Sequence, residues 1–130
     1  MYKINDKEYD CSIAVTLDIF NDKWKLSIIW NLLSEPKRFK DLHKSISKVT
    51  EKTLTIKLKE LEEKNIIHRE VFAQVPPKVV YSLTPAGERL REVFKDMFQW
   101  GVSYVEEHGI ISEDHISCED TISKKIGVIK

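Results

Sequence analysis

A chain of 130 residues can bury one hydrophobic core, so its length predicts a single domain with short flanks. The 21 Lys and Arg balance the 21 Asp and Glu, and a formal net charge of zero by itself argues against any nucleic-acid partner. No apolar run approaches the roughly 20 residues that cross a bilayer, and Met1 to Asp10 hold no hydrophobic signal core, so we expect a cytoplasmic protein with no membrane partner.

The charge is unevenly distributed along the chain. Between Glu35 and Leu83 there are eleven Lys or Arg and seven Asp or Glu, a local charge of about +4. Residues 1–34 carry about −1 and residues 84–130 about −3. The middle of the chain is therefore the part that a polyanion would attract.

Cysteine and histidine spacing predicts no metal site and no other cofactor. Cys11 and Cys118 lie far apart and form no CxxC pair, so neither a disulfide framework nor a structural zinc site is expected. The histidines have no i, i+4 spacing; they are His43, His68, His108 and His115.

Helical spacing of apolar residues runs through the first part of the chain. Residues 1–10 are polar and are expected to form a flexible arm. Apolar residues recur at helical spacing over 12–20 and again over 23–33, which predicts two helices. Asp22 can cap the second helix, and Pro36 follows its end.

Two more helices are predicted in the basic middle of the chain. The first covers residues 38–46, and the second begins at Thr50, a favourable N-cap residue. One face of the second is apolar, with Leu54, Leu58 and Leu61. At about 100° per residue, the opposite face carries Lys52, Thr53, Ile56, Lys59 and Glu63.

The remaining elements complete a winged helix-turn-helix of the α+β class. Two β-rich runs, 66–72 and 78–83, predict a hairpin with Pro76-Pro77 at its tip. Thr84-Pro85 is a cap followed by a first-turn proline, so a long helix is expected to run to His108. The winged-helix domain is expected at residues 11–108, and the sequence pattern predicts no helix or strand for the C-terminal tail at 109–130.

Several short motifs resemble one known family. They are Cys11-Ser12-Ile13, Lys23-Trp24, Arg38-Phe39-Lys40-Asp41-Leu42, Leu58-Lys59-Glu60-Leu61-Glu62 and Pro76-Pro77-Lys78-Val79-Val80-Tyr81-Ser82-Leu83-Thr84-Pro85-Ala86-Gly87. Together they resemble the HxlR family of bacterial transcription regulators, winged-helix relatives of the MarR group, over residues 11–105. The resemblance implies a homodimer joined through its first and last long helices, in which each subunit offers one recognition helix and one wing to double-stranded DNA.

Two positions depart from that family's pattern. Ser12 stands where the family usually has proline, and Asn21-Asp22 stands where it has a glycine pair. Serine can cap a helix and asparagine can adopt a left-handed turn, so the same fold is expected.

A recognition helix contacts bases mainly through its N-terminal residues. Threonine and lysine can hydrogen-bond base edges, and an outward isoleucine can touch a thymine methyl group. The candidates for base contacts are Thr50, Lys52, Thr53 and Ile56, with Lys59 nearer to phosphate. The alternative is the solvated face of an ordinary core helix, but the order of the elements favours the DNA interpretation.

Basic residues around this helix predict phosphate contacts, because neutralising phosphates needs cations that lie close together. They are Arg38, Lys40, Lys44 and Lys48. In the wing, the residues predicted to reach the flanking minor groove or the backbone are Arg69, Gln74 and Lys78. The alternative for these lysines is a merely soluble surface.

Cys11 stands at the predicted start of the first helix, where exposed amide groups and the helix dipole stabilise a thiolate. The resemblance implies that this cysteine is a sensing thiol for oxidants or electrophiles. The alternative is a small buried residue with no signalling role. Cys118 is a candidate resolving partner across the dimer.

Five aromatic residues are candidates for lining a pocket for a small-molecule effector: Trp24, Trp30, Phe98, Trp100 and Tyr104. Aromatic residues at helical spacing belong more often to a core or a dimer interface, and we favour that interpretation.

The combined hypothesis is a homodimeric transcriptional regulator on a pseudo-palindromic operator, with half-sites about one helical turn (~34 Å) apart. Modification of Cys11 or a bound small molecule would change its affinity. The alternative is a winged-helix protein-interaction module with no DNA role. An enzyme is not expected, because Cys11 has no base or second cysteine at catalytic spacing.

Overall fold

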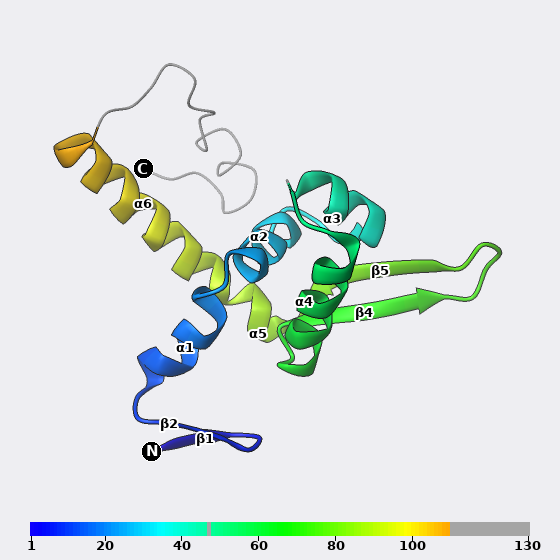
Figure 1. Ribbon diagram of the computed structural model, residues 1–130, viewed down its shortest axis with the longest axis horizontal. Helices are drawn as coiled ribbons and strands as arrows, with labels where there is room; N and C mark the ends of the chain where they lie inside the picture. The colour runs from blue at the N-terminus through cyan, green and yellow to red at the C-terminus, as the bar shows by residue number, and fades with distance from the viewer. Residues whose placement is uncertain (47, 110–130) are drawn as a thin grey trace.

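The computed structural model describes residues 1–46 and 48–109, so the tail from residue 110 onward, with Cys118, lies outside the described part. The described elements are, in order, β1 (Tyr2–Ile4), β2 (Lys7–Tyr9), α1 (Ser12–Phe20), α2 (Lys23–Leu32), β3 (Lys37–Arg38), α3 (Phe39–Ser45), α4 (Glu51–Glu63), β4 (Ile67–Phe72), β5 (Lys78–Leu83), α5 (Pro85–Glu88) and α6 (Leu90–His108). In Figure 1 the β4–β5 hairpin and α6 project in different directions from a centre that contains α2. This is the expected winged helix-turn-helix.

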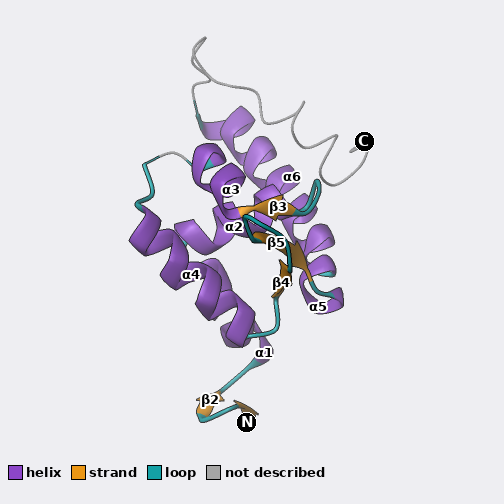
Figure 2. Cartoon of the chain, turned by 90° about the vertical axis from the view of Figure 1, so that its right-hand side faces the viewer, coloured by secondary structure: helices purple, strands orange, loops and turns teal. Residues whose placement is uncertain are grey.

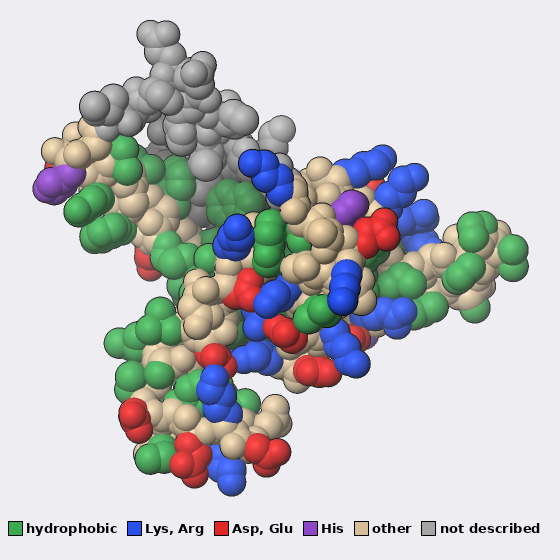
Figure 3. Space-filling model, in the orientation of Figure 1, with side chains coloured by type: hydrophobic (Ala, Val, Ile, Leu, Met, Phe, Trp, Pro, Cys, Tyr) green, Lys and Arg blue, Asp and Glu red, His purple; other side chains and the backbone are tan. Residues whose placement is uncertain are grey.

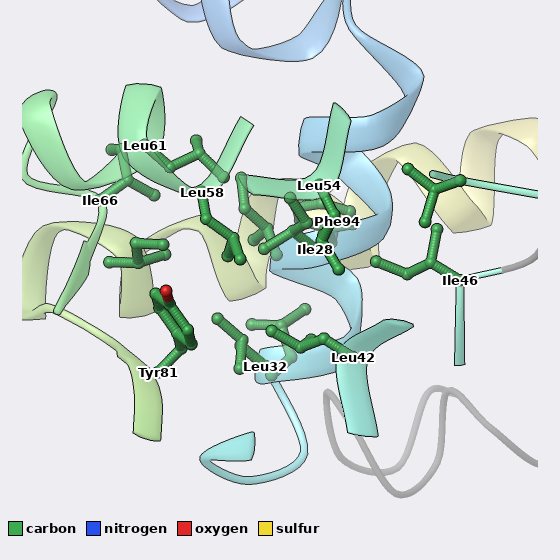
Figure 4. Packing of buried hydrophobic residues seen from close by; sticks show 14 residues of the cluster. Ile28, Leu32, Leu42, Ile46, Leu54, Leu58, Leu61, Ile66, Tyr81 and Phe94 are labelled. Atoms are coloured by element: carbon green, nitrogen blue, oxygen red, sulfur yellow. The ribbon is translucent and has the colours of Figure 1, made fainter. Parts of the chain in front are cut away.

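The core forms around α2, which packs against α1, α3, α4 and β5. Ile28 and Ile29 of α2 are completely buried. The three leucines predicted for the inner face of α4 are also buried, and Figure 4 shows them meeting Ile28 and Tyr81 in one apolar cluster. Burial of this stripe fixes which face of α4 is left for solvent.

Three predicted caps are present and set where helices begin. The side chain of Asp22 accepts hydrogen bonds from the backbone N–H groups of Trp24 and Lys25, at 2.9 and 3.2 Å. The Thr50 hydroxyl accepts one from the N–H of Thr53 at 3.1 Å. Thr84 does the same for Gly87 at 3.0 Å. Each cap satisfies donors that the first helical turn leaves without a partner.

The wing belongs to a three-stranded antiparallel sheet in the order β3-β5-β4. The β4–β5 register runs from Ile67 opposite Leu83 to Phe72 opposite Lys78. Viewed from the wing side, α4 lies on one side of this sheet and α5 on the other (Figure 2). Residues 71–77 are exposed, so the outer half of the hairpin stands clear of the core.

The N-terminal segment differs from the expected arm. Residues 2–9 form a hairpin, with Tyr2 paired to Tyr9 and Asn5 at the turn with a φ of 55°. Tyr9 is buried, and its hydroxyl donates to Asp18 Oδ2 at 2.6 Å. The expectation of a flexible arm rested on local polarity, whereas the partner that orders the segment lies in α1.

The long helix expected from Pro85 to His108 is interrupted at Arg89, giving α5 and α6. Thr84 and Gly87 are buried against the sheet and hold α5 there. In α6, Phe94 packs against the rings of Phe20 and Trp30, with centroids 5.4 and 5.8 Å apart. The sheet side therefore holds α5, the rings of α1 and α2 hold α6, and the break at Arg89 lies between the two.

Candidate nucleic-acid interface

The inner side of α4 is attached to α2 by ion pairs as well as by leucines. Lys57 Nζ lies 2.6 Å from Asp22 Oδ2, and Lys25 Nζ lies 2.9 Å from Glu60 Oε2. Burial by itself would raise the pKa of Asp22, but Lys57 and the two capping N–H groups outweigh it and lower that pKa. The charges are thus fixed toward α2, and α4 has one defined rotation about its axis.

The far end of α4 is tied to the N-terminal hairpin through Asp18 in α1. Asp18 Oδ2 lies 2.8 Å from Nζ of Lys64, the C-cap residue of α4, and Oδ1 lies 2.8 Å from Lys7 Nζ. Hydrogen bonds from Lys64, Lys7 and Tyr9 hold the pKa of Asp18 well below its usual range. We call Lys7, Tyr9, Asp18 and Lys64 the Asp18 cluster.

The outward face of α4 is open to solvent. Lys52, Ile56 and Lys59 are exposed, with Ile56 at 46%. Thr53 is half-buried. The Thr50 hydroxyl caps the helix and donates to Thr53 Oγ1 at 3.0 Å. Thr50 is therefore occupied as a cap. Of the other residues predicted to contact bases, Lys52 and Ile56 are exposed, as are their neighbours Glu51 and Thr55.

The predicted phosphate-binding residues surround this face. Arg38 lies in β3 opposite Val80 of β5, at the base of the wing. Lys40 and Lys48 are exposed, and Lys48 has a left-handed φ of 68° at the turn before α4. Figure 3 shows Lys and Arg side chains gathered over α3, α4 and the base of the wing, with a few acidic side chains among them.

The wing carries the other predicted contacts. Arg69 and Gln74 are exposed, whereas Lys78 is half-buried with its Nζ 5.2 Å from the centroid of the Phe72 ring. The pairing of Lys78 with an aromatic ring was not expected from the sequence. Of the eleven predicted DNA-contacting residues, nine are exposed and two, Thr53 and Lys78, are half-buried.

Cys11 is exposed and occupies the N-cap position of α1, directly after β2. Its extended backbone (φ −152°, ψ 164°) turns the chain from the hairpin into the helix. Within the described residues its side chain makes no capping hydrogen bond. The exposure of Cys11 contradicts the burial that the alternative supposed, and its sensing role stays a prediction.

Four of the five predicted aromatic residues fall into two groups, and the fifth, Phe98, is half-buried and packs against the core. Trp24 and Trp30 line a cavity together with Phe94, whereas Trp100 and Tyr104 lie exposed on α6 with their rings stacked 5.0 Å apart. The exposed pair belongs to a larger set of exposed apolar residues on two helices: Ile13 and Leu17 of α1, and Met97, Trp100, Tyr104 and Val105 of α6.

Sequence reasoning missed the residues that hold α4 in place. Asp18 and Lys64 are 46 positions apart, and no local pattern links them. Lys57 was assigned to neither helix face. One local signal did point to the N-terminal hairpin: Asn5 and Asp6, which both favour turns, lie between two short β-prone runs.

Over the described ranges, no helix is both long and apolar enough to cross a membrane.

Comparison with known proteins agrees with this geometry. The HxlR-like helix-turn-helix family matches residues 19–109. The HTH-type transcriptional regulator YdeP of Bacillus subtilis is 45% identical over 103 residues, covering 79% of this chain and 80% of YdeP. The reduced form of the regulator YodB from B. subtilis superposes with a TM-score of 0.69 at 34% identity, covering 76% of this chain and 98% of YodB.

Redox regulators are among the similar solved structures. The redox regulator HypR in its oxidised form has a TM-score of 0.66 at 41% identity, covering 72% of this chain and 96% of HypR. YodB has also been solved after diamide treatment, with a TM-score of 0.63 at 31% identity, covering 80% of this chain and 100% of that one. The matched range, the identities and the winged fold lead to one conclusion: the chain belongs to the HxlR family of helix-turn-helix transcriptional regulators, and not to a family of enzymes.

Proposed function

We propose that the protein is a homodimer that binds a pseudo-palindromic operator, with the N-terminal half of α4 in the major groove. The observation that carries this proposal is the division of α4 into two sides. Its leucines and the ion pairs of Lys57 and Glu60 face α2, while Lys52, Ile56 and Lys59 face solvent. A helix held in one rotation presents the same side chains to every base pair it meets.

The exposed apolar residues of α1 and α6 support the dimer. Six large apolar side chains on two helices have no cover within the described chain, which is unusual for a monomer. Contact with a second copy about a two-fold axis would bury them and repeat the same patch on both sides. The two copies of α4 would then meet successive major grooves about 34 Å apart.

The basic residues around α4 supply the electrostatic part of binding. Arg38, Lys40 and Lys48 lie near the turn and the base of the wing, where phosphates flank the groove that α4 enters. Arg69, Gln74 and Lys78 of the wing extend the contact toward the neighbouring minor groove. Each phosphate that a lysine or arginine neutralises makes the affinity more sensitive to salt.

Cys11 gives the protein a response to oxidants or electrophiles. Its thiol is exposed at the start of α1, one residue before a helix that forms half of the proposed dimer contact. Solved structures of HypR in oxidised form and of YodB after diamide treatment support this role by analogy. Modification of Cys11 changes how α1 meets the partner and hence the spacing of the two α4 helices.

The test is a titration of labelled DNA from the gene's own upstream region, followed by fluorescence anisotropy at increasing salt. We expect Lys59→Ala to reduce the salt slope by about one and Lys52→Ala to cost about 1–3 kcal/mol of specific binding. Lys3→Ala, an exposed lysine of the N-terminal hairpin, is the matched control. If all three variants bind like the parent chain, or if the parent shows no salt-sensitive binding, the protein-interaction alternative is favoured.

A further inference from the structure

The N-terminal hairpin of β1 and β2 is an addition to the winged helix-turn-helix. The family-matched range begins at residue 19, and the core cluster of the described chain includes no residue from β1 or β2. In Figure 1 the hairpin stands at the start of α1, apart from the wing. Of its described residues, only Tyr9 is buried, with 8% of its surface exposed. The hairpin is therefore held in place by contacts outside the core.

One carboxylate joins this hairpin to α4. The Tyr9 hydroxyl donates to Asp18 Oδ2 at 2.6 Å, and Nζ of Lys64 donates to the same oxygen at 2.8 Å. Lys7 Nζ donates to Oδ1 at 2.8 Å, so both carboxylate oxygens are occupied. The hydrogen bonds to Asp18 raise the pKa of Tyr9 and that of Lys7, which keeps both donors protonated. The hairpin and α4 thus share one oxygen atom as their link.

Lys64 is the C-cap of α4, at the end opposite the side chains predicted to contact bases. At 1.5 Å per residue, Lys52 lies about 18 Å from Lys64 along the helix axis, and Ile56 about 12 Å. The ion pairs of Lys57 and Glu60 hold the middle of α4, so a displacement of its C-terminal end tilts the helix about that point. The first turns then move too, and recognition tolerates displacements of only about 0.5 Å.

We propose that the N-terminal hairpin positions α4 for operator recognition, with Tyr9, Asp18 and Lys64 as positioning residues that do not themselves touch DNA. The link runs within one chain, from the hairpin through α1 to the C-terminal end of α4. Placement of α4 by the hairpin does not depend on DNA, whereas its effect on operator affinity rests on the proposed function. Attraction to phosphates tolerates a small tilt of α4, so the effect falls on sequence-specific binding.

The first experiment follows the backbone amide signals of α4 by NMR in the full chain without DNA. Tyr9→Phe removes the hydroxyl that donates to Asp18 and keeps the aromatic ring. We expect it to shift amide signals in the last turn of α4 and also in its first turns. Tyr2→Phe is the matched control, because Tyr2 is paired with Tyr9 across the hairpin, is 53% exposed and lies outside the Asp18 cluster. It should leave the signals of α4 in place.

The second experiment compares affinity for the operator with affinity for a scrambled duplex of the same length and composition. We expect Tyr9→Phe and Lys64→Met each to lower operator affinity about threefold to tenfold. Tyr9→Phe should leave affinity for the scrambled duplex unchanged, because it removes no charge. Lys3→Met, at an exposed lysine of the hairpin outside the Asp18 cluster, controls for the charge that Lys64→Met removes. Lys64→Arg keeps a cation beside Asp18 and should bind the operator almost as the parent does.

A double variant tests whether the two residues act through one carboxylate. Tyr9→Phe combined with Lys64→Met should lose little more operator affinity than the larger of the two single losses, because both donors serve Asp18 Oδ2. Urea unfolding shows whether each variant is folded under the conditions of the titration. Should Lys64→Met fail to fold, Lys7→Met takes its place and removes the donor to Oδ1.

The proposal is overturned if the first turns of α4 keep their amide signals in Tyr9→Phe, if the folded single variants bind the operator as the parent does, or if the two single losses simply multiply. Equal losses in Tyr2→Phe would also overturn it, because the hairpin would then act without Asp18. Absence of operator binding by the parent chain would instead overturn the proposed function, and the amide signals would still decide whether the hairpin positions α4.

Discussion

At the scale of single residues, Gly87 shows why one position in the Leu83-Thr84-Pro85-Ala86-Gly87 stretch has no side chain. A Cβ at this position would overlap the carbonyl oxygen of Ile66 and lie 3.2 Å from Leu83 Cδ2. The same carbonyl oxygen accepts a hydrogen bond from the N–H of Thr84 at 3.0 Å. The close approach of α5 to the sheet, and with it the start of α6, depends on this glycine.

We expect Gly87→Ala to lower the free energy of unfolding by about 1–3 kcal/mol, because the backbone of Ile66 must move to admit the methyl group. Urea unfolding followed by circular dichroism measures this. The control is Gly101→Ala in α6, where no described atom lies within 4 Å and alanine is the better helix former, by up to about 1 kcal/mol. Equal effects of the two substitutions would contradict the overlap.

Cys11 leads to a second prediction at this scale. Cys11→Ser should leave operator affinity close to that of the parent chain and remove its change after diamide treatment, because the exposed thiol is then absent. The measurement is the DNA titration before and after diamide, with mass spectrometry of the modified cysteine. Cys118→Ser tests the resolving role. A diamide response that persists in Cys11→Ser would show that Cys11 is not the sensor.

At the scale of elements, α4 is held at two places by charged groups from other helices. Along its length, Lys57 pairs with Asp22 and Glu60 pairs with Lys25. At its C-terminal end, Lys64 belongs to the Asp18 cluster. The Asp22 contact raises the pKa of Lys57. These partly buried pairs contribute orientation more than stability, because each charge also loses hydration.

Asp18→Asn should destabilise the domain by about 1 kcal/mol at neutral pH, because it removes the charge that Lys64 and Lys7 share. The folded-state pKa of Asp18 lies below its ordinary value near 3.8, so its contribution is present above that value and is lost as the pH falls toward the folded pKa. Urea unfolding of both proteins at neutral pH and at about pH 3 tests this. The difference in stability should shrink at the lower pH, and a constant or growing difference would refute it.

At the scale of the whole molecule, the domain presents two separate surfaces. One is basic and covers α3, α4 and the base of the wing, and the other is apolar and covers α1 and α6 (Figure 3). The net charge of zero does not indicate the basic surface, because most of the acidic residues lie elsewhere in the chain. Each surface suits one of the two proposed partners, DNA and a second copy of the chain.

Trp100→Glu should convert the proposed dimer into a folded monomer, because Trp100 is 68% exposed in one chain and a carboxylate would have to be buried in the contact. Operator affinity should fall with the loss of the second recognition helix. Sedimentation equilibrium and the DNA titration measure both effects. Ser103→Glu adds the same charge to an exposed position of the same helix and serves as the control. An unchanged dimer in Trp100→Glu would place the contact elsewhere.

Much of the fold followed from local patterns. Asp22, Thr50 and Thr84 were predicted as caps, and each makes its capping hydrogen bond. The wing followed from two β-prone runs around Pro76-Pro77; its first strand begins one residue later than expected, and its second has the expected bounds. Such features depend on a few neighbouring residues, so the sequence carries their full information.

What the sequence alone determined is therefore the order of the main helices and the wing, the faces of the helices and the family. The tertiary structure decided the N-terminal hairpin, the break at Arg89, the Asp18 cluster and the cavity beside Trp24 and Trp30. Each of these joins segments far apart in the chain, as with Asp18 and Lys64. Such contacts form only when packing brings the segments together. A local sequence pattern does not show which residues far along the chain will meet.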